Sequence, residues 1–115
     1  MGICFSPDGT KVYVANYGSN LVSVINASTY TVTTTLATGA NPQGVSISPD
    51  GTKLYVTNFG NKSVSVYSTV NNTLVSTITV GTNPKVVCFS PDGTKAFVSN
   101  YGSNNISIIN TYMRI

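Results

Sequence analysis

The chain has three acidic side chains, and these are the groups that acid–base chemistry would need. Asp8, Asp50 and Asp92 each belong to the hexapeptide Ser-Pro-Asp-Gly-Thr-Lys, which recurs at an interval of 42 residues. One acid in each repeat places the carboxyl groups one repeat unit apart, beyond the spacing of about 5–10 Å that paired catalytic carboxylates use. Asp also favours turns. We therefore predict that the three carboxylates support turns. The alternative is a calcium role, for which oxygen ligands are plentiful but not clustered.

Other catalytic groups are scarce. The chain contains no His, so the sequence offers no Ser-His or Cys-His pair, no His-ligated zinc and no histidine haem ligand. Cys4 and Cys88 stand at the same position of the first and third repeats. That equivalence separates them by more than the Cα distance of about 7 Å that a disulfide tolerates. We expect two free thiols, no cofactor, no metal and no catalytic site in these residues.

A set of aromatic, amide and lysine residues offers binding without catalysis. Each repeat has an aromatic residue directly after an Asn, and Lys85 breaks the repeat because Gln43 stands at the matching position. Flat rings and amides can hold a sugar or a peptide, and a lysine can meet an anionic ligand. The alternative, which we favour, is that the rings pack against neighbouring repeats and that Lys85 is a solvated loop residue. The predicted ligand or partner rim comprises Asn16, Tyr17, Asn58, Phe59, Lys85, Asn100 and Tyr101.

The composition predicts an all-β protein and excludes some partners. Ser, Thr and Asn are abundant and favour strands and turns, whereas Glu is absent. The net charge of +3 comes from scattered lysines and one arginine, so no basic patch indicates nucleic-acid binding. No apolar run approaches the length of about 18 residues that a membrane helix needs. Residues 1–9 lack a basic region followed by an apolar one, so we expect no signal peptide in this chain.

The 42-residue period organises the whole chain. Residues 2–42 and 44–84 are identical at 19 of 41 positions, which is typical of a repeat protein. Within each unit, short runs of alternating apolar residues are separated by turn residues, and this pattern predicts a four-stranded antiparallel meander. The expected repeats are residues 2–43, 44–85 and 86–115, about 2.75 units with four, four and three strands. The fold class we predict is therefore a partial β-propeller.

The repeats resemble those of the YVTN-repeat propeller family. The shared features are Asn-Pro, then Ser-Pro-Asp-Gly-Thr-Lys, then Leu-Tyr-Val-Thr-Asn-Phe-Gly at residues 54–60, then a Val-Ser-Val strand. The Ser-Pro-Asp-Gly turn is also similar to that of WD-repeat propellers, but the Trp-Asp and Gly-His pairs of that family are missing. The resemblance implies a β-propeller, and it implies a surface or exported prokaryotic protein.

Two functions remain open at this stage. In the first, the protein is a non-catalytic scaffold or interaction module that closes its ring by self-association. Head-to-tail contacts between two copies would supply six blades, with each third blade lacking its outer strand or borrowing residues 111–115. In the second, the chain is a fragment of a longer propeller, which provides the missing blades and supports an oxidoreductase or hydrolase site elsewhere. Neither function involves nucleic acid or membrane insertion.

Overall fold

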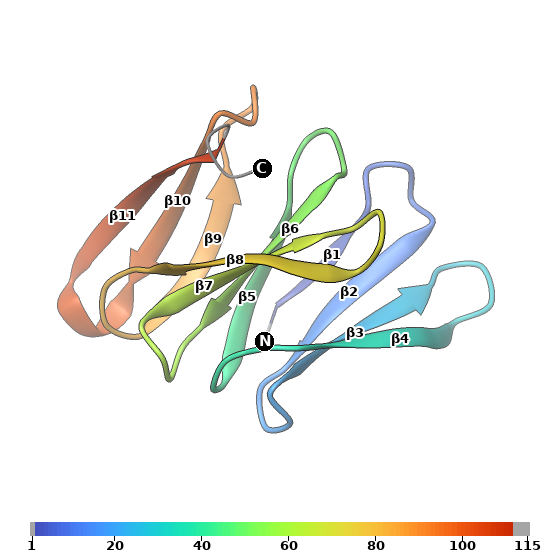
Figure 1. Ribbon diagram of the computed structural model, residues 1–115, viewed down its shortest axis with the longest axis horizontal. Helices are drawn as coiled ribbons and strands as arrows, with labels where there is room; N and C mark the ends of the chain where they lie inside the picture. Colours follow the sequence, from blue (N-terminus) through green and yellow to red (C-terminus); the bar gives the residue numbers. More distant parts are fainter. Residues whose placement is uncertain (1, 112–115) are drawn as a thin grey trace.

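In the computed structural model, which describes residues 2–111, the chain forms three antiparallel sheets packed side by side (Figure 1). We call them the first blade (residues 3–37), the middle blade (residues 42–79) and the third blade (residues 84–110). Successive strands pair within each blade, which confirms the predicted meanders with four, four and three strands. The strands are β1 (Ile3–Phe5), β2 (Lys11–Asn16), β3 (Leu21–Asn26), β4 (Thr31–Ala37), β5 (Pro42–Ile47), β6 (Lys53–Asn58), β7 (Ser63–Ser68), β8 (Thr73–Thr79), β9 (Pro84–Phe89), β10 (Lys95–Asn100) and β11 (Asn105–Asn110).

Tight turns join the first two strands of each blade, as predicted. In the first of them the Gly9 N–H donates to the Ser6 carbonyl at 2.9 Å, the bond of a four-residue turn. Gly9, Gly51 and Gly93 have φ of 76°, 79° and 77°, a conformation that glycine adopts at little steric cost. The repeated hexapeptide is therefore the repeated reversal between the innermost strand and its neighbour.

Three local features differ from the sequence predictions. The sequence predicts that the innermost strands of the second and third repeats begin at residues 45 and 87. β5 and β9 begin three residues earlier, at Pro42 and Pro84, because proline is tolerated at the first residue of a strand. Residues Tyr101–Ser103 form a short 3-10 helix, η1, where a plain turn was expected. Lys85 lies inside β9 and not in the loop before it. The predicted use of residues 111–115 as an added strand falls almost entirely outside the described residues.

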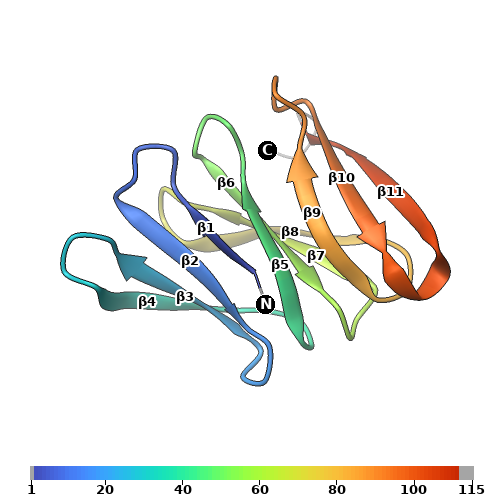
Figure 2. The same ribbon diagram turned by 180° about the vertical axis from the view of Figure 1, so that it is seen from behind.

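The apolar core lies between the blades. Figure 2 shows the innermost strands β1, β5 and β9 side by side, with β5 in the centre. One cluster of buried residues joins the first and middle blades, and a second joins the middle and third blades. The first comprises Tyr13, Val22, Val24, Leu36, Leu54, Val56 and Tyr67. The second comprises Tyr55, Val64, Val66, Val87, Ala96, Val98 and Ile109.

The two junctions are built from the same repeat positions. Tyr13, Val22 and Val24 contact the middle blade, and their equivalents 42 residues later, Tyr55, Val64 and Val66, contact the third blade. The opposite sides of the two junctions also match. Leu54 and Val56 of the middle blade contact the first blade, and their equivalents Ala96 and Val98 of the third blade contact the middle blade. The middle blade therefore packs on the first blade with one face and on the third blade with the other. Within residues 2–111, no helix has the length and hydrophobicity needed to cross a membrane.

Candidate functional site

Each aspartate is the centre of a turn. Asp50 Oδ1 accepts a hydrogen bond from the Ser48 hydroxyl at 2.7 Å, and further bonds from the Thr52 backbone N–H at 3.0 Å and the Thr52 hydroxyl at 2.8 Å. Asp8 and Asp92 make the same three bonds in their own turns. The geometry supports the predicted turn role of all three carboxylates.

These hydrogen bonds stabilise the ionised carboxylates. The Ser6 hydroxyl, followed by the Thr10 backbone and hydroxyl, lowers the pKa of Asp8 to about 2. The Thr94 backbone N–H and the Ser90 hydroxyl lower the pKa of Asp92 to about 2. The pKa of Asp50 is also lowered, chiefly by the Ser48 hydroxyl. Carboxylates with such depressed pKa values are poor general acids and bases near neutral pH.

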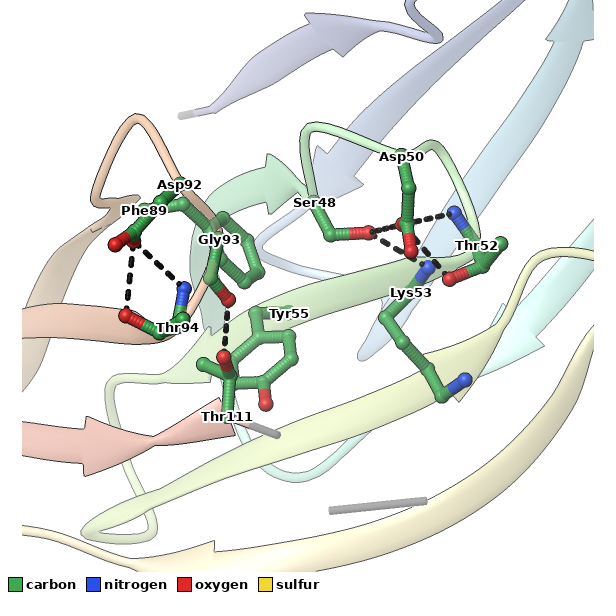
Figure 3. A pocket seen from close by; sticks show the side chains of 10 residues that line it. All are labelled: Ser48, Asp50, Thr52, Lys53, Tyr55, Phe89, Asp92, Gly93, Thr94 and Thr111. Carbon is green, nitrogen blue, oxygen red and sulfur yellow. Dashed lines mark hydrogen bonds between the residues drawn. The ribbon is translucent and has the colours of Figure 1, made fainter. Parts of the chain in front are cut away.

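A pocket of about 340 Å³ lies between the turns of the middle and third blades (Figure 3). Asp50 and Asp92 stand on its two sides, and Phe89 meets Tyr55 edge-to-face with ring centroids 4.8 Å apart. Thr111 closes one side by donating its hydroxyl to the Gly93 carbonyl. No group of three or more potential metal-ligating side chains occurs in the part of the chain that the structure describes. Most hydroxyl and carboxyl groups of this pocket belong to the turns, and Lys53 and Tyr55 also line it.

The opposite edge of the blades carries the predicted rim. Its aromatic residues are only partly stacked: Tyr17 and Phe59 are tilted by 55°, with centroids 6.2 Å apart. Tyr101 is 66% exposed, and the Lys85 ammonium lies 5.0 Å from the centre of its ring, a cation–π contact. The structure thus brings Lys85 and Tyr101 together, and it brings Tyr17 and Phe59 together.

The asparagines of that rim make hydrogen bonds within the blades. Asn58 and Asn100 are buried. The Asn58 amide donates to the hydroxyls of Ser63 and Ser65, and its Oδ1 accepts from the Gly39 N–H at 3.1 Å. The amide of Asn16, in the first blade, donates to Ser23 at 2.8 Å. We therefore assign these three residues to holding neighbouring strands together, while a ligand role for the remaining rim residues stays a prediction.

The Asn-Pro motif joins one blade to the next. The Asn41 amide donates to the Tyr17 carbonyl of the first blade at 3.3 Å, while the Asn41 carbonyl accepts from the Phe59 N–H of the middle blade at 3.0 Å. Asn83 repeats the pair, donating to the Phe59 carbonyl and accepting from the Tyr101 N–H. Both asparagines have positive φ, of 55° and 52°, which Asn tolerates better than most residues. The motif was recognised in the sequence, but this role was not.

The innermost strands touch through their backbones. A Cβ built on Gly44 would lie 2.5 Å from the Lys85 carbonyl oxygen, and one built on Gly2 would lie 2.8 Å from the Gln43 carbonyl oxygen. Gly44 does not have a positive φ, so it is required for space and not for backbone conformation. A shallow pocket of about 230 Å³ runs across these strands from Gly2 to Val86. Val86 occupies the repeat position of Gly2 and Gly44, a break in the repeat that sequence reasoning missed.

Apolar residues are exposed at both ends of the row of blades. They are the repeat equivalents of residues that pack at the internal junctions. The first face is the side of the first blade away from the middle blade, and the last face is the side of the third blade away from the middle blade. Ile3 is 63% exposed on the first face and Ile108 is 58% exposed on the last face. The first face comprises Ile3, Phe5, Val12, Val14 and Ile25. The last face comprises Val86, Cys88, Phe97, Ile106 and Ile108.

The two cysteines report the same contrast. Both are free, as predicted. Cys4 packs against the junction between the first and middle blades, and burial raises the pKa of its thiol to about 11. Cys88, at the equivalent position of the third blade, is exposed on the last face. One thiol therefore lies at a junction between blades, and the other lies on the exposed last face.

Comparisons with known proteins agree on the fold. Residues 2–112 match the family model described as lactonase, seven-bladed β-propeller. The chain is similar to a solved structure of hydrazine synthase from Kuenenia stuttgartiensis, with 33% identity and a TM-score of 0.94 over 98% of this chain and 33% of that one. No curated protein sequence matches the chain significantly.

Two further solved structures share the fold at lower identity. Both carry the name "putative 6-phosphogluconolactonase". The one from Bacteroides uniformis is 22% identical with a TM-score of 0.83, over 98% of this chain and 37% of that one. The one from Bacteroides fragilis is 24% identical with a TM-score of 0.83, over 94% of this chain and 33% of that one. The chain thus spans about a third of the length of the solved structures it matches.

Proposed function

The chain belongs to the lactonase family of seven-bladed β-propellers, and we propose that it acts within that fold as a non-catalytic scaffold whose two end faces dock further blades. The observation that carries this proposal is that the end faces and the internal junctions use the same repeat positions. The exposed residues of the first and last faces occupy positions that are buried or partly buried at the two internal junctions. An exposed apolar patch of this kind marks an interaction site.

In a solution of this chain alone, the blade that docks is supplied by a second copy. The last face of one copy then receives the first face of another, because the internal junctions use this pairing. Head-to-tail contacts close into a ring or extend as a fibre according to the rotation at each step. A six-bladed homodimer is the ring that two copies of three blades would form.

The non-catalytic part of the proposal rests on how the available groups are used. Each aspartate carries three hydrogen bonds of its own turn, and the sequence has no His or Glu to complete an acid–base pair. A scaffold needs neither group. The narrower assignment to YVTN-repeat proteins, and a surface or exported location, belong to the same proposal.

A second candidate function is favoured by the family's blade number. Two copies of this chain supply six blades, whereas the family is described by seven, and the matched solved chains are about three times as long. In this alternative, the three blades support an enzymatic site that other blades of a longer propeller provide. The end faces would again dock blades, but those blades would lie in the same polypeptide.

Light scattering during size-exclusion chromatography tests the docking of a second copy. The variant is Ile108→Asp on the last face, and the matched control is Val32→Asp, since Val32 is 57% exposed on the outer strand β4. Leu74, the equivalent of Val32 in the flanked middle blade, is also 56% exposed, so this position is not covered at a junction. We expect dimers for the wild type and the control, and monomers for Ile108→Asp. A folded, monomeric wild type would exclude self-docking and leave the longer-propeller candidate.

A further inference from the structure

The spacing of the innermost strands is set by glycine at both internal junctions. The Cβ position of Gly44 lies 2.5 Å from the Lys85 carbonyl oxygen and 3.3 Å from the Val86 Cα. Real Cβ atoms do not approach a backbone oxygen this closely, so even alanine at residue 44 would force the strands apart. Gly2 meets backbone atoms of Gln43 and Val45 in the same way, both at 2.8 Å. Close contact between innermost strands therefore requires glycine at this repeat position.

The third blade has valine at that position, and the backbone N–H of this residue keeps its hydrogen bond to the neighbouring strand. The Val86 N–H donates to the Ser99 hydroxyl at 3.1 Å, as the Gly44 N–H donates to the Thr57 hydroxyl at 2.7 Å. The strand β9 is thus placed in its blade as β5 is in the middle blade. The Val86 side chain is 56% exposed on the last face, directed where the next innermost strand would lie.

We propose that Val86 is the specificity-determining residue of the last face, because it prevents a docking blade from making the close innermost-strand contact used at the other two junctions. This inference rests on the proposed docking function. A second copy of the chain docks on the last face only with its innermost strand set back from β9. The junction between the last face of one copy and the first face of another is therefore weaker than the two internal junctions. It is also wider at the innermost strands.

Two neighbouring features would change with this set-back. Inside the chain, the Thr57 hydroxyl contacts the Lys85 carbonyl across the junction at 3.2 Å; Ser99, its equivalent, would be too far from the docking strand for the same contact. A pocket of about 280 Å³ beside Lys85, Tyr101 and Ile106 opens on the last face. If the innermost strand of the second copy is set back from β9, the side of this pocket next to Lys85 remains accessible between the two copies.

The test measures the dimer dissociation constant by sedimentation equilibrium for the wild type, Val86→Gly and Val86→Ala. Removing all side-chain atoms restores the close contact, so Val86→Gly should lower the dissociation constant by about tenfold or more. Val86→Ala still carries the Cβ that the geometry forbids and should stay close to the wild type. If Val86 instead stabilises the dimer through an apolar contact, both substitutions will raise the dissociation constant. That result would contradict the proposal.

A bulkier variant tests the proposal even if Val86→Gly does not fold. Phenylalanine favours strands, so Val86→Phe should keep the fold, checked by circular dichroism, and should dimerise less than the wild type. If Val86→Phe dimerises as well as the wild type, Val86 does not control docking.

The outcomes separate this inference from the proposed function. If the wild type dimerises and Val86→Gly does so no more tightly, self-docking stands and the role of Val86 is wrong. If only Val86→Gly dimerises, Val86 blocks self-docking in the native chain, so the inference stands and the homodimer is wrong. If neither protein associates, both proposals are wrong.

Discussion

The middle blade and the third blade have closely related sequences but differ in what they bury. In β6 five consecutive residues are buried, whereas β10 alternates between buried and accessible residues. The same contrast holds between β7 and β11. A blade flanked on both sides buries both faces of its strands, as in other sheets covered on both sides. Within residues 2–111 the third blade has a neighbour on one side only, and its exposed apolar residues hold repeat positions that pack at the internal junctions.

The largest effect is expected at a repeat position that is buried in the middle blade and exposed in the third blade. Tyr55 is 1% exposed in the middle blade, and Phe97, its equivalent, is 38% exposed on the last face. Tyr55→Ala should lower the free energy of unfolding by about 3–5 kcal/mol, because it leaves a cavity in the core. Phe97→Ala should cost about 1 kcal/mol or less in the monomer. Urea unfolding at low protein concentration measures both; equal costs would contradict the contrast.

A smaller effect is expected from overpacking the innermost strands. Gly44→Ala places a Cβ against the Lys85 carbonyl and should cost about 1–3 kcal/mol. Gly18→Ala is the control, because no atom beyond its chain neighbours lies within 4 Å of its Cβ position and its φ is not positive. Gly18→Ala should be neutral or slightly stabilising. Thermal unfolding distinguishes the two, and an unaffected Gly44→Ala variant would remove the steric argument.

The smallest effects should come from the turns, which are alike in all three blades. The hydrogen bonds from Ser and Thr lower the pKa of Asp8 and Asp92 to about 2 from the ordinary value of 3.8. Because the folded-state pKa is the lower one, their stabilisation is present above about pH 4 and is lost as the pH falls toward 2. The melting temperature should therefore decrease between pH 4 and pH 2.

Substitution checks that assignment. Asp50→Asn should reduce the acid sensitivity and cost about 1 kcal/mol or less at pH 7. Asp8→Asn and Asp92→Asn should reduce the acid sensitivity similarly, because each turn makes the same bonds. A loss of stability already between pH 7 and pH 5 would indicate a different titrating group.

Much of the fold could be predicted from the sequence because each repeat contains its own strands and turns. The three Ser-Pro-Asp-Gly turns and the four-four-three strand count are confirmed. Relations between blades were harder to predict. The inward direction of Asn58 depends on Ser65 and Gly39, which face it only after the strands pair. The role of Val86 depends on the distance between innermost strands, and its only sequence signal is a glycine missing from one repeat.

The most direct test of the account compares Cys4 and Cys88, which hold the same repeat position at a filled and an unfilled junction. The alkylation rate of each thiol is measured by mass spectrometry over a range of protein concentrations. Cys4 should react slowly at every concentration, because it is packed against the internal junction and burial raises its pKa to about 11. Cys88 should react fast in dilute solution and more slowly at high protein concentration, where a second copy covers the last face. A Cys88 rate that stays fast and constant up to high concentration, in folded protein, would contradict the docking of a second copy on this face.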